Sequence, residues 1–575
     1  MIILRILKDT AVNVALCGLI IGCSNGFRAT TSSPTLPGSQ DQPAISPDQA
    51  RPSENDKNSI DTESQPSEVT EVEQFAIFER TFQHSGTYTN PYQDVTALAT
   101  FTNSNGKTVT IPLFWNGNQE WKVRFSPDVE GIWRWSIDSN DSGLDGQSGS
   151  LTTVASTSNG GIRVNPAFPY HFEYQDGTPF WLLGDTHWHA FGVDQPETLN
   201  RTTFEQYIDI RASQGFNFIH ANVLDPGQNE GGSAFHNLAS EEVNPEFWQE
   251  VDARIEYMNQ KGITAMLFLT WSHKESGWRK FLPWGDPDAD WRQFPSQEAR
   301  LRYAQFLTAR YSAYNVAFSV SGEWDEFGSQ DMYQAIAQMI ETTDPHDRLI
   351  TIHPGGRASV EEFANEPWMS FGDYQQNYET LHSKILEARE HNKPVINSEY
   401  AYYLRDQNED GEVDKPNSST LEEIRHASWD IVMAGGYFVT GWGTTYFGGG
   451  RDPGPFNPTD PRNADWEEDV QHIRKLFTEL DWWKLEPHPE LLSGAGTHYA
   501  LAEIGKQYVV YTRGSNEALE LSLGNRDIRT YQVRLFDPRT GIYTSLANYR
   551  GNTAIRLEPP DNQDWLFLIT DDSNR

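Results

Sequence analysis

The strongest constraint in the sequence is a repeated alternation of short apolar segments with longer amphipathic ones between residues 181 and 442. Eight such strand–helix units in a stretch of this length match a (β/α)8 barrel of about 250 residues, whereas a doubly wound sheet would not require eight. The expected strands are 181–186, 216–222, 264–271, 316–323, 349–353, 368–373, 394–399 and 436–442. The pattern predicts a TIM barrel at residues 158–487.

Short strands of a different kind flank this central part. Between residues 72 and 156, and again after residue 487, polar and apolar residues alternate in short runs that are separated by Gly, Asn and Asp. Period-two alternation with regular turn signals is typical of antiparallel sandwiches. We therefore expect a multidomain chain, in which the barrel lies between an N-terminal β-sandwich at 71–157 and a C-terminal β-sandwich at 488–575.

The first 70 residues have the features of an export signal and a tether. Basic residues precede an apolar run at 10–21, which has the length of a signal-peptide core and is too short to span a bilayer. A small residue then precedes Cys23, as in a bacterial lipoprotein cleavage box, although an ordinary signal cut after Ala29 is an alternative. Residues 24–70 are polar and predict a disordered tether. The expected location is the cell envelope, where cleavage within the lipoprotein signal segment (1–23) leaves lipidated Cys23 as the first residue of the mature chain and its membrane anchor.

Charge and cysteine content exclude several classes of function. The chain has 44 basic and 81 acidic residues and a net charge of −37. A nucleic-acid partner is not expected, because phosphate binding requires a basic surface. Both cysteines lie within the first 23 residues, so the rest of the chain has no thiol for a disulfide, a metal site or a nucleophile.

Polar and aromatic residues gather where the predicted strands end, which is where barrels of this kind carry their chemistry. Glu323 ends the fourth strand and Glu399 the seventh. Glycosidic cleavage needs two such carboxyl groups, one to protonate the departing oxygen and one to attack the sugar or activate water. Rival acids are Asp185 and Asp373, and Asp325 follows Glu323 closely. Candidate substrate-binding residues are Asp185, His187, His189, His220, Asn222, Trp271, His273, His353, Asp373, Tyr374, Tyr400, Trp442 and Tyr446.

Three motifs in the predicted barrel carry a resemblance to a known family. Residues 181–188 (WLLGDTHW), 322–323 (GE) and 397–400 (NSEY) resemble apiosidase-like, endoglucanase-type barrels among the clan A glycoside hydrolases. The turn at 536–541 (FDPRTG) resembles a C-terminal module that is named as a collagen-binding domain of a collagenase. The resemblance covers residues 72–570.

This resemblance implies a glycoside hydrolase that needs no cofactor for its chemistry. It assigns Glu323 as the general acid/base and Glu399 as the nucleophile, with retention of anomeric configuration. The implied partner is a carbohydrate, which we expect to be a plant or algal poly- or oligosaccharide.

One position departs from the clan A pattern. Those barrels have Asn immediately before the acid/base, where it contacts the sugar, and this chain has Gly322. A contact to the 2-hydroxyl must then come from elsewhere, with Asn222, His220 and His273 as candidates by location, or be absent. A carbohydrate-binding lipoprotein without activity is therefore an alternative, and a collagen-adhesive protein is a third reading.

The loop after the seventh predicted strand contains a possible calcium signal. Gly411 stands at the sixth position of the loop, and Asn417 stands at the twelfth, where a bidentate Glu or an Asp is expected. A solvated acidic loop is the alternative to a structural calcium ion. The oxygen ligands at alternate positions are Asp406, Asn408, Asp410 and Glu412.

Overall fold

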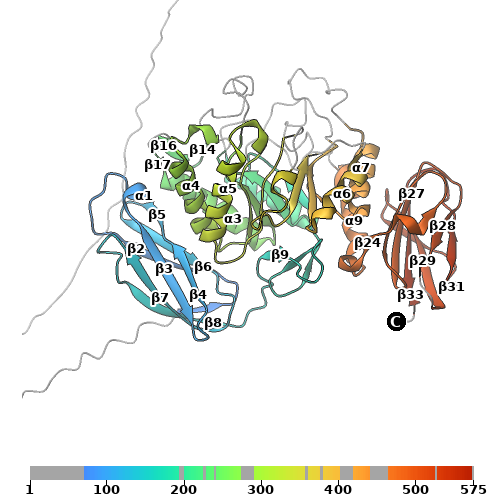
Figure 1. Ribbon diagram of the computed structural model, residues 1–575, viewed down its shortest axis with the longest axis horizontal. Helices are drawn as coiled ribbons and strands as arrows, with labels where there is room; N and C mark the ends of the chain where they lie inside the picture. Colours follow the sequence, from blue (N-terminus) through green and yellow to red (C-terminus); the bar gives the residue numbers. More distant parts are fainter. Residues whose placement is uncertain are drawn as a thin grey trace, which may run out of the picture. The chain divides into compact units, whose positions relative to one another are not determined.

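The structure is a computed structural model of a multidomain, β-rich chain (Figure 1). It describes residues 70–192, 200–224, 228–237, 241–272, 290–355, 360–375, 380–401, 419–440, 464–524 and 527–572. The described residues form three hydrophobic cores, of which the largest lies in the central part of the chain. The predicted signal peptide, Cys23 and the tether up to residue 69 lie outside the described residues.

Two antiparallel-rich sheets form the N-terminal part. The larger has the order β1 (Thr70–Glu73), β8 (Ser148–Val154), β7 (Gly131–Ser139), β3 (Ala97–Asn103) and β4 (Thr108–Pro112). The smaller has the order β2 (Phe78–Gln83), β6 (Glu120–Phe125) and β5 (Phe114–Gly117). Alternate residues of β3 are buried, as the period-two pattern predicts. Phe101 of β3, Phe125 of β6 and Trp133 of β7 share one core.

Parallel strands, hydrogen-bonded in chain order, form the central part. One sheet contains β12 (Gly184–Thr186), β13 (Phe218–Asn222), β18 (Thr264–Phe268), β19 (Val316–Ser319) and β20 (Ile350–Thr351). A second contains β21 (Gly372–Gln375), β22 (Val395–Glu399) and β23 (Tyr437–Phe438). Each of these strands overlaps a predicted one. They are buried on both faces, which explains why they read as apolar runs.

The free edges of these two sheets contact each other at both sides. The Ser370 amide, two residues before β21, donates to the Ile350 carbonyl of β20 over 2.8 Å. At the other side, Gly184 of β12 forms a parallel bridge with Val439, and the Thr440 amide donates to the Gly184 carbonyl over 2.9 Å. The first and last strands are therefore neighbours.

Helices separate these strands at the predicted intervals (Figure 1). Several begin at a residue whose side chain accepts a backbone amide of the first turn, which favours a helix start. Thr420 and Glu423 form a capping box. Among the described helices, none has a stretch long and apolar enough to cross a membrane. The helices are α2 (Arg201–Ser213), α3 (Pro245–Gln260), α4 (Gln297–Tyr311), α5 (Gln330–Thr343), α6 (Leu381–Ala388), α7 (Leu421–Met433) and α9 (Ala464–Thr478).

Two further sheets form the C-terminal part around a third core, which contains Tyr508, Leu519 and Phe567. One has the order β24 (Glu486–Pro487), β26 (Thr497–Glu503), β27 (Gln507–Arg513), β33 (Trp565–Asp571), β29 (Arg529–Asp537) and β30 (Ile542–Ser545), with β31 (Tyr549–Gly551) also paired to β29. The other has the order β25 (Leu492–Ser493), β28 (Leu519–Ser522) and β32 (Ala554–Leu557).

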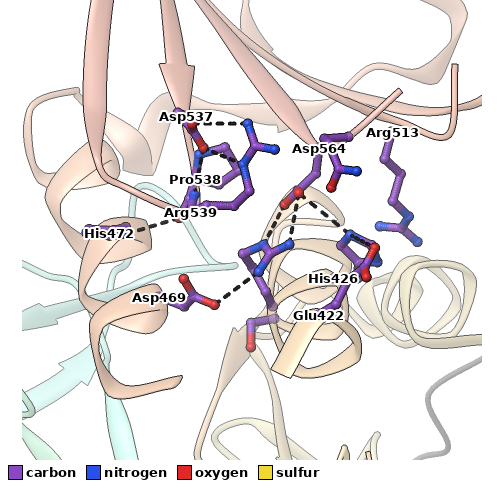
Figure 2. A network of polar contacts seen from close by, with 12 residues as sticks. Glu422, His426, Asp469, His472, Arg513, Asp537, Pro538, Arg539 and Asp564 are labelled. Carbon is purple, nitrogen blue, oxygen red and sulfur yellow. Dashed lines mark hydrogen bonds and ion pairs between the residues drawn. The ribbon is translucent and has the colours of Figure 1, made fainter. Parts of the chain in front are cut away.

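Buried ion pairs connect the C-terminal sheets to helices α7 and α9. Asp564, which directly precedes β33 and is labelled in Figure 2, accepts hydrogen bonds from the guanidinium of Arg425 on α7 at 2.8 and 3.0 Å. Arg425 also lies 3.4 Å from Asp469 of α9. Nearby, Arg513 of β27 donates to both carboxylate oxygens of Asp430 on α7. The two parts are therefore joined by charges that have little contact with water.

Candidate active site

The two acidic residues predicted to be catalytic lie close together. Glu399 is the last residue of β22, and Glu323 follows β19 at the start of the 3₁₀ turn Trp324–Glu326. Both side chains are partly buried. Trp271, which donates to Glu323, has its ring 5.9 Å from the ring of His353, and His353 Nε2 lies 3.4 Å from Glu399 Oε1, so both acids adjoin the same pair of rings. The parallel strands thus bring together two acids that are 76 positions apart by their numbers.

Glu323 has the environment of a protonated acid. Burial, and then the charges of Glu399 and Glu326, raise its pKa to about 7, while a hydrogen bond from Trp271 opposes the shift. That bond runs from the Trp271 indole Nε1 to the Glu323 Oε2 over 3.1 Å. The Glu323 backbone is left-handed, with φ 42° and ψ 51°, a conformation that is strained for residues other than glycine and recurs at functional sites. A carboxyl group that keeps its proton near neutral pH can act as a general acid.

Gly322 makes room for Trp271. A Cβ atom on Gly322 would lie 2.1 Å from Cε3 and 2.3 Å from Cζ3 of the Trp271 ring. The φ of Gly322 lies outside the left-handed region, so space and not backbone conformation excludes a side chain here. The residue that departs from the clan A pattern is therefore the one against which Trp271 packs, and Trp271 in turn donates to Glu323.

Glu399 has a hydrogen-bond donor at one carboxylate oxygen and a histidine nitrogen near the other. Gln375 Nε2 donates to its Oε2 over 2.5 Å, and His353 Nε2 lies 3.4 Å from its Oε1. Gln375 is a residue that the sequence did not single out. A register shift between Tyr374 and Gln375 places Gln375 opposite Glu399 in the pairing of β21 with β22. Tyr374, for which the sequence predicts a substrate contact, is buried, and burial raises its pKa.

His353 and Asp373 lie next to Glu399 and are more deeply buried than it is. His353 Nδ1 lies 3.1 Å from Asp373 Oδ2 and 3.3 Å from Ser398 Oγ, while its Nε2 faces Glu399. The side chains of His353 and Asp373 are both 0% exposed. Burial alone would lower the pKa of His353, but Asp373 and Glu399 raise it to about 10. The ring is therefore a cation between two carboxylates at neutral pH.

With this geometry in hand, comparison with known proteins identifies the family. Residues 169–484 match the family model described as "Apiosidase-like, catalytic domain". The chain belongs to the apiosidase-like family. That membership makes the protein a glycoside hydrolase and confirms the resemblance of the motifs at 181–188, 322–323 and 397–400, which lie within the matched range. Residues 71–140 match a domain of unknown function, DUF5060. No curated protein matches the chain.

Solved structures share the fold of this apiosidase-like enzyme. A candidate glycoside hydrolase from Bacteroides vulgatus ATCC 8482 superposes with a TM-score of 0.68 at 19% identity, over 87% of this chain and 100% of that one. A glycoside hydrolase family 5 structure from the same organism gives a TM-score of 0.59 at 18% identity, over 72% of this chain and 94% of that one. At these low identities, the TM-scores indicate that the proteins share a fold and say nothing about a shared substrate.

In the apiosidase-like enzyme, Asp185 has the environment of a structural ion pair. Its fully buried carboxylate accepts hydrogen bonds from Arg211 Nε at 2.5 Å, Tyr207 Oη at 3.0 Å and Thr440 Oγ1 at 2.6 Å. Arg211 and Tyr207 belong to α2, and Thr440 follows β23. Asp185 therefore joins β12 to α2 and to the end of the last parallel strand.

The remaining predicted contacts just after β12 and on β13 are buried. His187, His189, His220 and Asn222 are almost inaccessible to solvent. The ring of His220 packs against aromatic rings that include Phe268, and burial lowers its pKa to about 4. It is therefore a neutral imidazole under ordinary conditions. Contacts of these residues with a substrate stay predictions.

Of the other predicted site residues, one is buried and the rest lie outside the residues that the structure describes. Tyr400 is buried, and its hydroxyl lies 2.9 Å from Ser428 Oγ on α7. Within the described ranges, no group of three or more His, Cys, Asp or Glu side chains is arranged to hold a metal ion. The predictions that fall outside the described residues are His273, Trp442, Tyr446 and the calcium loop with Asp406, Asn408, Asp410 and Glu412.

Proposed function

We propose that this enzyme hydrolyses a glycosidic bond of a plant or algal poly- or oligosaccharide with Glu323 as general acid/base and Glu399 as nucleophile. The observation that carries the proposal is the contrast between two neighbouring carboxyl groups. The pKa of Glu323 is raised to about 7, whereas Glu399 receives a hydrogen bond from Gln375 and faces the cationic ring of His353. Pairs of acids with such different surroundings divide the roles of proton donor and nucleophile.

The proposed reaction has two steps. In the first, Glu323 gives its proton to the departing glycosidic oxygen while Glu399 attacks the anomeric carbon and forms a covalent glycosyl-enzyme. In the second, Glu323, now ionised, takes a proton from water, and that water displaces Glu399 from the sugar. Two inversions at the anomeric carbon give net retention. Gln375 and His353 would hold the Glu399 oxygens in position for the attack.

We propose further that the parallel strands close into a (β/α)8 barrel and that the flanking pairs of sheets are β-sandwiches. The contacts between Ser370 and Ile350, and between Thr440 and Gly184, support closure of the barrel. In this architecture Glu323 and Glu399 occupy the carboxyl ends of strands four and seven, where such enzymes carry their chemistry.

The N-terminal sequence supports export as a lipoprotein with Cys23 as the lipid anchor. The enzyme would then meet its glycan in the cell envelope. A Cys23→Ser variant is expected to leave the membrane fraction and to lose incorporation of labelled fatty acid. Unchanged membrane association of that variant would rule out the anchor.

The test of the catalytic assignment is a panel of plant and algal glycans with product analysis. Glu323→Gln and Glu399→Gln are compared with Glu362→Gln, the same substitution at an exposed position on the turn Glu361–Phe363. We expect the first two variants to lose activity by at least about 10²-fold, because general acid–base catalysis alone contributes 10²–10⁴, and the third to keep it. Proton NMR of the first product reports the anomeric configuration.

The outcomes separate the candidate functions. Unaltered hydrolysis by both active-site variants would overturn the assignment of the two acids. An inverted first product would overturn retention. Binding of a glycan by the parent enzyme without any turnover would favour the carbohydrate-binding lipoprotein, the alternative raised by Gly322.

A further inference from the structure

His353 and Asp373 lie too deep to serve as sugar contacts. Both side chains are 0% exposed, and the His353 ring is surrounded by the rings of Phe268, Trp188 and Trp271, with centroids 5.7, 6.2 and 5.9 Å away. These aromatic rings separate the imidazole from solvent. A group in this position can influence the reaction only through a neighbour that reaches the substrate.

That neighbour is Glu399. The His353 ring uses its two nitrogens in opposite directions, because Nδ1 lies 3.1 Å from Asp373 Oδ2 and Nε2 lies 3.4 Å from Glu399 Oε1. Ser398 Oγ, 3.3 Å from Nδ1, is a second polar neighbour on that side. A hydrogen bond to one ring nitrogen fixes the orientation of an imidazole and determines what the other nitrogen presents.

We propose that Asp373 and His353 form a positioning pair, in which Asp373 orients His353 and His353 holds Glu399 in place as an ionised carboxylate. The inference rests on the proposed function, since it assumes that Glu399 is the nucleophile. It gives His353 and Asp373 a role different from the substrate contact predicted for them from sequence.

The charges around the ring favour this role. Titratable groups face His353 from four elements: Asp373 on β21, Glu399 on β22, Glu323 after β19 and His220 on β13. Asp373 and Glu399 are the groups that keep the ring protonated, because they raise the pKa of His353 to about 10 against the effect of burial. Burial keeps His220 neutral, and burial together with the nearby acids raises the pKa of Glu323 to about 7, so that a large part of Glu323 is protonated at neutral pH. A cation between the carboxyl groups of Asp373 and Glu399 favours the ionised form of Glu399 beside a second acid.

The kinetic test uses Asp373→Asn, which removes the charge and keeps the shape. The ring would then lose its proton at lower pH, and Glu399 would lose the neighbouring positive charge that favours its ionised form. We expect kcat to fall about 10-fold or more with little change in KM, because the pair does not touch the sugar, and the acidic limb of kcat/KM to move to higher pH. His353→Gln is a second variant, expected to show the same loss.

The chain offers a matched control in a second buried His–Asp pair. His346 Nδ1 lies 3.3 Å from Asp344 Oδ1, both side chains are 3% exposed, and Asp344 caps the end of α5. Asp344→Asn should lower the melting temperature without moving the pH profile. A pH profile and kcat for Asp373→Asn that match those of the parent would overturn the proposal.

A direct measurement separates this proposal from the catalytic assignment. In protein labelled with ¹⁵N-histidine, the His353 signal is assigned by its loss in His353→Gln. We expect this ring to stay doubly protonated through pH 8 in the parent and to titrate at lower pH in Asp373→Asn. A neutral His353 ring at pH 7 in the parent would overturn the pair. If the parent cleaves no glycan, the proposed function fails, and this titration still decides the state of His353.

Discussion

A methyl group added at Gly322 tests whether the packing of Trp271 on this glycine positions Glu323. In Gly322→Ala the new Cβ would meet the Trp271 ring at 2.1 Å, whereas ordinary contact begins near 3.4 Å. The ring must therefore withdraw by about 1 Å, and the 3.1 Å hydrogen bond from its Nε1 to Glu323 would be broken or misdirected. A misplacement of about 1 Å in an active site can cost about 10²-fold in rate, and overpacking costs typically about 1–3 kcal/mol of stability.

The assay is kcat/KM against pH on the best glycan, with circular dichroism and thermal unfolding to confirm the fold. We expect Gly322→Ala to lose about 10²-fold in kcat/KM and to unfold a few degrees lower. Trp271→Ala alone should also be impaired, because Glu323 then loses its donor. The decisive variant is the double one, in which the methyl group has no ring to meet, so adding Gly322→Ala to Trp271→Ala should cost little more.

Two results would refute this reasoning. A Gly322→Ala enzyme with the parent rate would show that the packing of Trp271 on Gly322 does not position Glu323. Strictly additive losses in the double variant would show that the methyl group acts through something other than the indole ring.

Three other predictions follow from the structure. Trp271→Phe removes the hydrogen bond that lowers the pKa of Glu323, so the basic limb of kcat/KM should move to higher pH, and an unmoved limb would contradict this role of the indole. Arg124→Met removes a buried partner of Asp252 at the contact between β6 and α3, and should cost about 3 kcal/mol in urea unfolding, where an unchanged midpoint would contradict it. Although burial opposes it, hydrogen bonds from His426 and Arg425 hold the pKa of Asp564 below its usual value, so the stability that Asp564 contributes is present above about pH 4 and is lost below it. Thermal unfolding of Asp564→Asn should therefore depend less on pH between 2 and 4 than that of the parent.

The positions of the parallel strands could be predicted because each is a short apolar run between longer amphipathic segments. Glu323 and Glu399 could be found for the same reason, since both stand where a predicted strand ends. The residues at which strands end are harder to predict than their positions. The sequence predicts that the sixth strand ends at Asp373, whereas the observed strand ends at Gln375. Because side chains alternate along a strand, this difference selected Tyr374 as a contact and missed Gln375.

Contacts between side chains on different strands could not be predicted at all. Nothing in the local sequence indicates that His353 turns one nitrogen to Asp373 and the other to Glu399, since the three residues belong to separate segments. Likewise, glycine at position 322 read as a missing sugar contact. The structure shows that a side chain at position 322 would overlap the Trp271 ring. The sequence cannot show this, because packing depends on residues that are distant in sequence.

The buried ion pairs between α7 and the C-terminal sheets, near the labelled Asp564 and Arg513 of Figure 2, affect where this enzyme can be truncated. The change of strand pattern near residue 487 looks like a place to end a shorter catalytic fragment. Such a fragment would keep Arg425 and Asp430 on α7 but lose Asp564 and Arg513, leaving charges exposed or unpaired on a helix that packs beside the active-site strands. We therefore expect the border between the two sequence patterns not to be a border between two independently folding units. Engineering of the catalytic part should retain the C-terminal sheets or neutralise both residues on α7 together.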